Sequence, residues 1–281
     1  MYPRQPPPIA NTDPNLTGAP MAMPMGPMPY LINSPQNFVY FMDPMTELSQ
    51  SSGAIIRQQV EMLEVVTGCE TQNRYHVFIE TPMGLKYAFK CNERSGGCAR
   101  CCCAPSNREL EMIIRHVISH EQLDGDLAKI FVRIEKPCTC PCCCFCRPHM
   151  DVRLEDTNKF IGQIREPCTC CDLDTEVYDS VGNLRYLITG DCCQLGLCCG
   201  STAQKLASIN FNILEGGRVV GSFKKLSSSF GEFFSKADSY RVGFPPNARP
   251  EDKMLLIIAG LMIDYQFFEK DEDTPTQSYY Y

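Results

Sequence analysis

Six cysteines lie within nine residues, at Cys138, Cys140, Cys142, Cys143, Cys144 and Cys146, in a chain of 281 residues that holds 19 cysteines. Thiols this dense have three chemical uses, namely disulfides, metal thiolates and S-acylation. Residues 1–35 show no positively charged region followed by an apolar core, which a secretory signal would have. We therefore expect a reducing compartment, in which disulfides do not persist.

Zinc is one use of these thiols. The C-x-x-C spacing of zinc ligands occurs at Cys98/Cys101, Cys140/Cys143, Cys143/Cys146 and Cys168/Cys171, with His149 close by. Runs of three adjacent cysteines produce this spacing by chance, however, and neighbouring thiolates rarely reach one tetrahedral ion together. Zinc therefore stays the second interpretation.

S-acylation needs only exposed thiols near a membrane, and several acyl chains together give stable anchoring. We expect acylation of the six cysteines between Cys138 and Cys146. The isolated Cys69 and Cys91 are expected to pack as small apolar side chains.

The composition sets limits on function. A hydrophobic content of 44% is ordinary for a globular protein, and the net charge of −7 argues against nucleic-acid binding, which needs a concentrated basic surface. The four histidines, His76, His116, His120 and His149, form no paired catalytic pattern. We therefore expect a protein that performs no covalent chemistry.

Residues 1–45 are rich in Pro and Met and show neither a helical nor a strand period, which predicts a disordered tail. The segment Pro3-Arg4-Gln5-Pro6 matches the pattern that proline-motif-binding proteins recognise. We assign residues 46–270 to the folded domain and residues 271–281 to an acidic, tyrosine-containing C-terminal tail.

Beyond residue 46, short runs of β-branched and aromatic residues alternate near period two, which is typical of antiparallel sheets and barrels. Residues 134–140 and 164–170 both read Ile-x-x-Pro-Cys-Thr-Cys, so a strand halted by proline passes into cysteines twice. This repeat predicts that both cysteine segments lie at one rim of a barrel. The ten predicted strands are 74–80, 85–90, 110–116, 128–135, 150–154, 160–165, 176–178, 184–189, 208–214 and 218–223.

An apolar segment near the C-terminus is followed by an acid. It consists of Met254, Leu255, Leu256, Ile257, Ile258, Ala259, Gly260, Leu261, Met262 and Ile263, with Asp264 next. A membrane span needs about 20 apolar residues. A shorter helix that is apolar all round is more often the buried core of a domain. Burial as a central helix and short or tilted membrane insertion both remain open.

The order and spacing of several segments resemble the phospholipid scramblase family over residues 48–269. These segments are the Pro-rich tail, residues 58–68 and 70–75, the cysteines 138–146 and 192–199, Ala237-Asp238 leading to Gly243-Phe244-Pro245, and residues 254–269. The resemblance implies a mostly β fold, a tubby-like closed antiparallel β-barrel around the hydrophobic C-terminal helix. It also implies ATP-independent, calcium-triggered movement of phospholipids between leaflets, with palmitoylation of the cysteines between Cys138 and Cys146.

The family's acidic calcium loop corresponds to residues 236–247, where Lys236 and Asn247 stand in place of aspartates. Calcium loops gain affinity from carboxylate ligands. Only Asp238 remains as a carboxylate here, with Ser239 and Asn247 as neutral candidates. We therefore expect calcium binding at this loop to be weak or absent.

Two functions follow from the sequence. The first is a phospholipid scramblase attached to the cytoplasmic face of a membrane, by resemblance the plasma membrane. The second is a palmitoylated interaction module without transport activity, whose tail recruits partners. A buried helix favours the second function, and the family resemblance favours the first.

Overall fold

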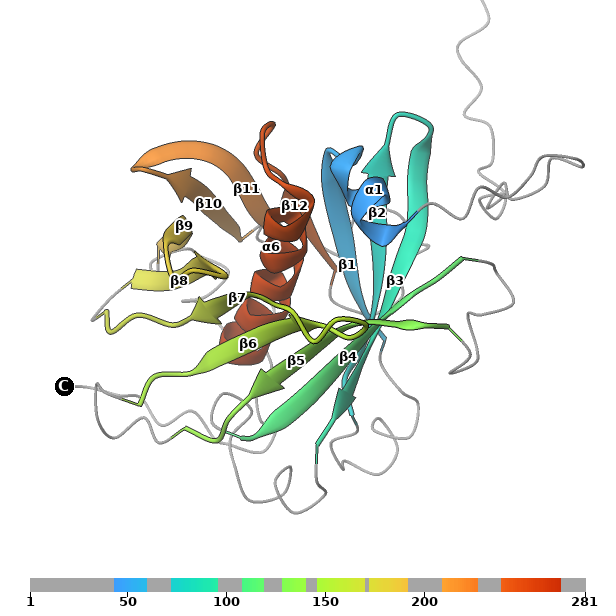
Figure 1. Cartoon of the computed structure of the whole chain (residues 1–281). Coiled ribbons are helices and arrows are strands. Elements are labelled where there is room, and N and C mark those ends of the chain that lie inside the picture. Colours follow the sequence, from blue (N-terminus) through green and yellow to red (C-terminus); the bar gives the residue numbers. More distant parts are fainter. Residues whose placement is uncertain are drawn as a thin grey trace, which may run out of the picture. The chain divides into compact units, whose positions relative to one another are not determined.

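The computed structural model describes residues 43–59, 72–95, 108–118, 128–139, 146–169, 172–191, 209–226 and 239–268. They form a closed barrel of twelve antiparallel strands around one helix (Figure 1). Each strand pairs with the next along the chain, and the first strand closes the barrel by pairing with the last. The predicted antiparallel barrel around a C-terminal helix is confirmed.

The helix α1 (Pro44–Ser49) precedes the barrel. The strands are β1 (Gly53–Gln59), β2 (Arg74–Thr81), β3 (Gly84–Arg94), β4 (Leu110–His116), β5 (Ile130–Lys136), β6 (His149–Leu154), β7 (Phe160–Arg165), β8 (Asp172–Asp179), β9 (Leu184–Asp191), β10 (Asn210–Glu215), β11 (Arg218–Leu226) and β12 (Ser239–Gly243). All ten predicted strands are present, with β3, β8, β9 and β11 longer than expected by two residues or more. The sequence interpretation missed β1 and β12, which close the barrel through Ile56 opposite Tyr240.

Alternate residues of each strand point into the barrel. In β2, for example, Tyr75, Val77 and Ile79 are fully buried, while the residues between them are partly exposed. Period-two alternation of this kind places one face of a strand in the core. The inward side chains of the whole ring form one hydrophobic cluster with the central helix.

The central helix α6 (Pro250–Ile263) begins with proline at its first position and continues into one π-helical turn, η2 (Asp264–Phe268). Its side chains from Asp252 to Ile263 are buried. Fourteen residues give a helix of about 21 Å, at 1.5 Å per residue. Of the two interpretations of residues 254–264, the structure shows the buried helix.

Small residues let the helix approach the wall. A Cβ atom at Gly260 would lie 2.8 Å from Cδ1 of Ile56 and 2.9 Å from Cε2 of Phe223. On the wall itself, a Cβ atom at Gly162 would lie 2.7 Å from Cδ1 of Leu255. These glycines therefore set the distance between α6 and the strands. None of the helices in the described ranges has the length and apolarity that a membrane span requires.

Because neighbouring strands run in opposite directions, their connections leave the barrel at two rims. We call one the hairpin rim; there β2 joins β3, β4 joins β5, β6 joins β7, β8 joins β9, β10 joins β11, and β12 leads into α6. At the opposite rim, β1 joins β2, β3 joins β4, β5 joins β6, β7 joins β8, β9 joins β10, and β11 joins β12. Every cysteine except Cys91 belongs to these latter segments, so we call this end the cysteine rim.

The start of α6 is fastened at the hairpin rim. The Lys253 ammonium donates hydrogen bonds to the carbonyl oxygens of Leu48 at 2.9 Å, Ser49 at 3.0 Å and Ser51 at 2.7 Å. Burial lowers the pKa of Lys253. These bonds hold α1 and the chain after it against the start of α6.

Candidate functional site at the cysteine rim

Exposed thiols lie at the cysteine rim. Cys138 and Cys146, at the two ends of the predicted acylation cluster, are exposed, and so is Cys168 in the second copy of the repeated motif. Exposure is what S-acylation requires of a thiol. Cys140, Cys142, Cys143 and Cys144 lie outside the described residues, so acylation of the six remains a prediction.

The repeated motif has a structural meaning. Lys136 and Glu166 occupy the same place in the two copies, two residues before Cys138 and Cys168. Lys136 is buried and donates a hydrogen bond to the carbonyl oxygen of Arg108 at 2.7 Å. Glu166 accepts a hydrogen bond from the side chain of Gln266 at 2.7 Å. Both strand ends thus turn a polar side chain inward just before the chain enters its cysteines, and both connections leave the same rim, as the repeat predicts.

Arg108, whose carbonyl oxygen accepts from Lys136, belongs to a buried ion pair. Glu93, near the end of β3, and Arg108, just before β4, lie 3.3 Å apart, and both side chains are fully buried. The hydroxyl of Tyr265 donates to Glu93 at 2.7 Å, and the Arg108 guanidinium lies 5.9 Å from the centre of the Tyr265 ring. Buried charges persist only when they are paired and hydrogen-bonded, and here Tyr265 of η2 completes the pairing.

Asp264 fixes the same end of the helix. Its carboxylate accepts a hydrogen bond from the hydroxyl of Tyr75 in β2, at 2.6 Å, and another from the hydroxyl of Tyr240 in β12. These strands flank β1 on either side. Asp264 therefore ties the end of α6 to the strands beside the closure of the barrel.

Glu166 links the two cysteine-bearing connections. Arg147, directly after Cys146, forms an ion pair with Glu166, two residues before Cys168. Burial raises the pKa of Glu166, against the opposing effect of Arg147 and Lys136. Through Gln266, the middle residue of η2, this pair also contacts the continuation of the central helix, so a described end of each connection is fastened to it.

The calcium candidates are spread along β12. Ser239 is buried at the first position of the strand, at the cysteine rim, whereas Asn247 is exposed beyond its other end, at the hairpin rim. A strand of five residues spans about 13 Å between its first and last Cα atoms. Asp238 lies outside the described residues. Calcium binding at this loop stays a prediction.

Within the described ranges, no group of three or more His, Cys, Asp or Glu side chains is arranged to hold a metal ion. Of the zinc candidates, the structure describes Cys146, Cys168 and His149, and the others lie outside the described ranges. Zinc binding is therefore untested and also stays a prediction.

Sequence reasoning missed the polar residues that fasten this rim. Neither Lys136 nor Glu166 stood out, although both lie in the repeated motif whose proline and cysteines did. The available signal was that Lys136 and Glu166 each stand directly before the proline of their copy of the motif. The partners Glu93, Arg108 and Tyr265 gave no signal, because they come from distant parts of the chain.

Comparison with known proteins shows which family this chain is similar to. The Scramblase family model matches residues 31–270. Phospholipid scramblase 2 of Bos taurus is 29% identical over 261 residues, which cover 90% of this chain and 78% of that protein. Phospholipid scramblase 1 of Mus musculus is 28% identical over 254 residues, which cover 88% of this chain and 68% of that protein.

A more distant relative also matches this chain. Phospholipid scramblase 4 of Mus musculus is 24% identical over 226 residues, which cover 79% of this chain and 64% of that protein. No solved structure gives a significant match. Since the family model spans most of the chain, from before α1 to beyond η2, this protein belongs to the Scramblase family.

Proposed function

We propose that this protein moves phospholipids between the two leaflets of a membrane, in both directions and without ATP. The observation that carries this proposal is the family match over residues 31–270, together with relatives named phospholipid scramblases 1, 2 and 4. Such movement runs down a gradient. It therefore needs a lowered barrier for headgroups and no covalent catalysis.

The cysteine rim is the proposed membrane-attachment end. Exposed Cys138 and Cys146 bracket the six cysteines that we expect to be acylated, and several acyl chains give stable anchoring. We place the barrel at the cytoplasmic face, with the plasma membrane as its proposed location. Because Ser239 and Asn247 lie at opposite rims, we propose that tight calcium binding by residues 236–247 is not required.

The burial of α6 favours a second candidate function. Every residue from Met254 to Ile263 is enclosed by the barrel, so these side chains contact no lipid in this conformation. In that case the protein is a lipid-anchored interaction module, and its Pro-rich tail recruits proline-motif-binding proteins.

The two functions are separated by a translocation assay. The purified protein is reconstituted into vesicles that contain a fluorescent phospholipid, and a membrane-impermeant quencher is added outside, without nucleotide and with or without calcium. Loss of fluorescence well beyond the outer-leaflet share supports scrambling. A signal that stops at the level of protein-free vesicles contradicts scrambling and supports the interaction module.

A cysteine variant tests attachment separately. Replacement of Cys138, Cys140, Cys142, Cys143, Cys144 and Cys146 by serine should release the protein from the membrane fraction of cells. Because reconstitution from detergent brings the protein to the vesicle membrane without acyl chains, translocation in vesicles should persist in this variant. Unchanged membrane attachment in cells would contradict the role of these six thiols.

A further inference from the structure

We propose that the hairpin rim carries a second lipid-contact surface, formed by apolar side chains at the tips of three hairpins. Met83 between β2 and β3 is 99% exposed, Val181 between β8 and β9 is 78% exposed, and Val219 at the start of β11 is 62% exposed. Leu85 and Leu184, 49% and 51% exposed, lie beside the first two tips. In the described part of the chain, these five are the exposed large apolar side chains, and all lie at this one rim.

The tips have defined turn geometry. At the β2–β3 tip, Gly84 has φ of 115°, and the Thr81 hydroxyl donates to the Gly84 carbonyl oxygen at 2.7 Å. At the β8–β9 tip, the Asp179 carboxylate accepts hydrogen bonds from the backbone N–H groups of Val181 at 3.1 Å and Asn183 at 2.9 Å. In these two turns polar groups bond within the turn, and the apolar side chains of Met83 and Val181 are exposed to solvent.

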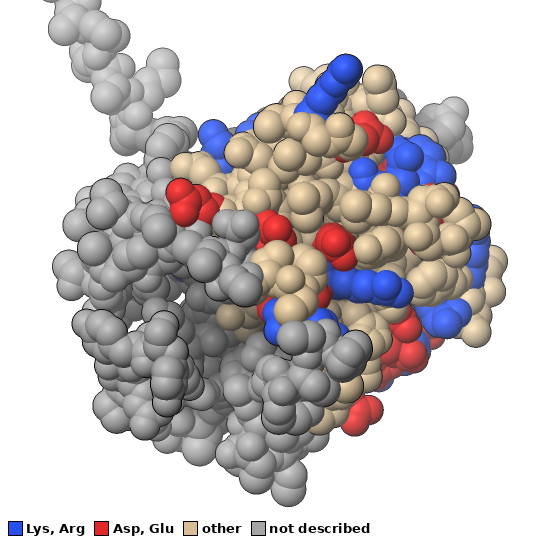
Figure 2. Space-filling model, turned by 90° about the vertical axis from the view of Figure 1, so that its left-hand side faces the viewer, with Lys and Arg blue, Asp and Glu red and all other residues tan. Residues whose placement is uncertain are grey.

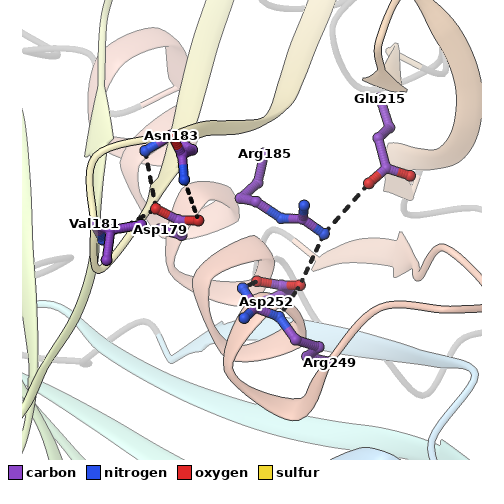
Figure 3. A network of polar contacts seen from close by, with 7 residues as sticks. All are labelled: Asp179, Val181, Asn183, Arg185, Glu215, Arg249 and Asp252. Atoms are coloured by element: carbon purple, nitrogen blue, oxygen red, sulfur yellow. Dashed lines mark hydrogen bonds and ion pairs between the residues drawn. The ribbon is translucent and has the colours of Figure 1, made fainter.

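Two of these tips belong to one continuous surface. Arg185, at the start of β9, lies 3.4 Å from Glu215 at the end of β10 and 3.5 Å from Asp252 in the first turn of α6 (Figure 3). Arg249 also pairs with Asp252, at 2.8 Å. These ion pairs hold the β8–β9 hairpin, the β10–β11 hairpin and the start of α6 together.

The spacing of the tips favours a lipid surface over a protein partner. The β2–β3 hairpin is separated from the β10–β11 hairpin by β1 and β12. A stable protein interface buries about 800 Å² of continuous surface on each partner. Separate apolar points do not provide such a surface, whereas a bilayer accepts each point independently, as apolar side chains enter the boundary of headgroups and acyl chains.

The charges indicate which lipid is needed. At this rim Arg185 pairs with Glu215 and Asp252, and Arg249 pairs with Asp252. Positive and negative side chains are interspersed on the side of the molecule that carries β8, β9 and β10 (Figure 2). The described residues of this face therefore provide no single-sign field that would select anionic lipids. Apolar contact with neutral phosphatidylcholine should suffice, and binding should depend little on salt.

This surface lies at the opposite end of the barrel from the cysteine rim, with α6 running between them. The hairpin rim should consequently bind a bilayer without acylation. The inference does not rest on lipid movement, because binding to vesicles is measured without translocation.

The test uses the full chain in which the six cysteines from Cys138 to Cys146 are replaced by serine, kept under reducing conditions. Its sedimentation with phosphatidylcholine vesicles is compared with that of the same chain carrying Met83→Ser, Val181→Ser and Val219→Ser. We expect these substitutions to lower the partition coefficient about tenfold or more, since each removes an apolar group from the contact. A thermal melt confirms that the variant stays folded.

The matched control replaces exposed polar residues on the same and neighbouring elements, with Asn212→Ser, Arg218→Ser and Lys224→Ser. It should bind within about twofold of the parent chain, because these side chains add no apolar contact. The inference is overturned if the parent chain does not bind vesicles, if the apolar variant binds as well as the parent, or if high salt or the polar control abolishes binding.

Discussion

At the scale of single residues, Asp264 is a carboxylate buried at the end of an apolar helix. It accepts hydrogen bonds from the hydroxyls of Tyr75 and Tyr240. Asp264→Ala removes this acceptor and should lower the free energy of unfolding by about 2–4 kcal/mol. Asp264→Asn keeps one acceptor oxygen and should cost less. Urea unfolding of both variants measures the difference, and an alanine variant as stable as the parent would show that the two tyrosines do not depend on Asp264.

The buried carboxyl group of Glu47 in α1 should make the stability of the fold depend on pH. Burial alone would raise the pKa of this carboxyl group, but hydrogen bonds from His116 and Lys86 outweigh burial and hold the pKa below its ordinary value of 4.5. A lowered pKa in the folded state stabilises the fold above pH 4.5, and this stabilisation is lost as the pH falls through the folded pKa.

Glu47→Gln should therefore reduce the free energy of unfolding at pH 7, by about 1 kcal/mol. As the pH falls through the lowered folded-state pKa of Glu47, the difference between parent and variant should shrink, because the parent carboxyl group becomes protonated. Denaturant unfolding at pH 7 and at a series of lower pH values checks this expectation. A difference that is the same at all of these values would mean that the charge of Glu47 does not contribute.

The thiols should differ in reactivity by position. Burial raises the pKa of Cys91, whose side chain is fully buried, whereas Cys138 is exposed. Because the thiolate is the reactive form, alkylation of the folded protein should modify Cys138 and leave Cys91 unmodified until denaturant is added. Peptide mass spectrometry reads both sites in one sample. Equal modification rates in the folded state would contradict the burial of Cys91.

At the scale of elements, Gly260 controls how α6 packs against the wall. A Cβ atom there would meet Ile56 and Phe223 at less than 3.0 Å. Gly260→Ala should therefore lower the free energy of unfolding by about 1–3 kcal/mol, although alanine favours the helix. Adding Ile56→Val removes the nearest atom, Cδ1, and should recover part of this loss. If Gly260→Ala stabilises the protein, α6 does not pack as closely as the structure shows.

The predictability of the elements follows from their physical signals. Ten strands were predictable because buried and exposed side chains alternate along runs of β-branched and aromatic residues. β12 also alternates, with Tyr240 and Val242 inward, but its five residues give a weak signal. They were instead assigned to a calcium-binding loop. β1 was missed as well, because its second half, from Arg57 to Gln59, is polar.

The hydrogen bonds and ion pairs between polar side chains at the cysteine rim were not predictable from local sequence patterns. Asp264 was visible as an acid after an apolar run, but its partner Tyr75 lies 189 positions away. Only the closure of the barrel brings β2 and β12 around the end of α6. The repeated Pro-Cys-Thr-Cys motif did indicate a common rim, because proline ends a strand wherever the ladder needs an N–H donor.

At the scale of the whole molecule, the closed barrel constrains how lipid movement could occur. Release of α6 would break the bonds of Asp264 to Tyr75 and Tyr240 and those of Lys253 to the chain around α1. It would also expose the inward apolar face of all twelve strands. We therefore expect α6 to stay inside the barrel when the protein is bound to a membrane.

Hydrogen exchange on vesicles tests this expectation. Amides of residues 254–263 and of β1 and β12 should exchange as slowly on phospholipid vesicles as in solution, because the helix and the closing strands protect one another. If α6 instead entered the bilayer, its own amides would remain protected by lipid, while those of β1 and β12 would exchange faster around an empty core. The strands thus report on the position of the helix. Faster exchange in β1 and β12, together with translocation of lipid, would assign scrambling to an opened barrel, whereas unchanged exchange with translocation would assign it to the outer surface of the closed one.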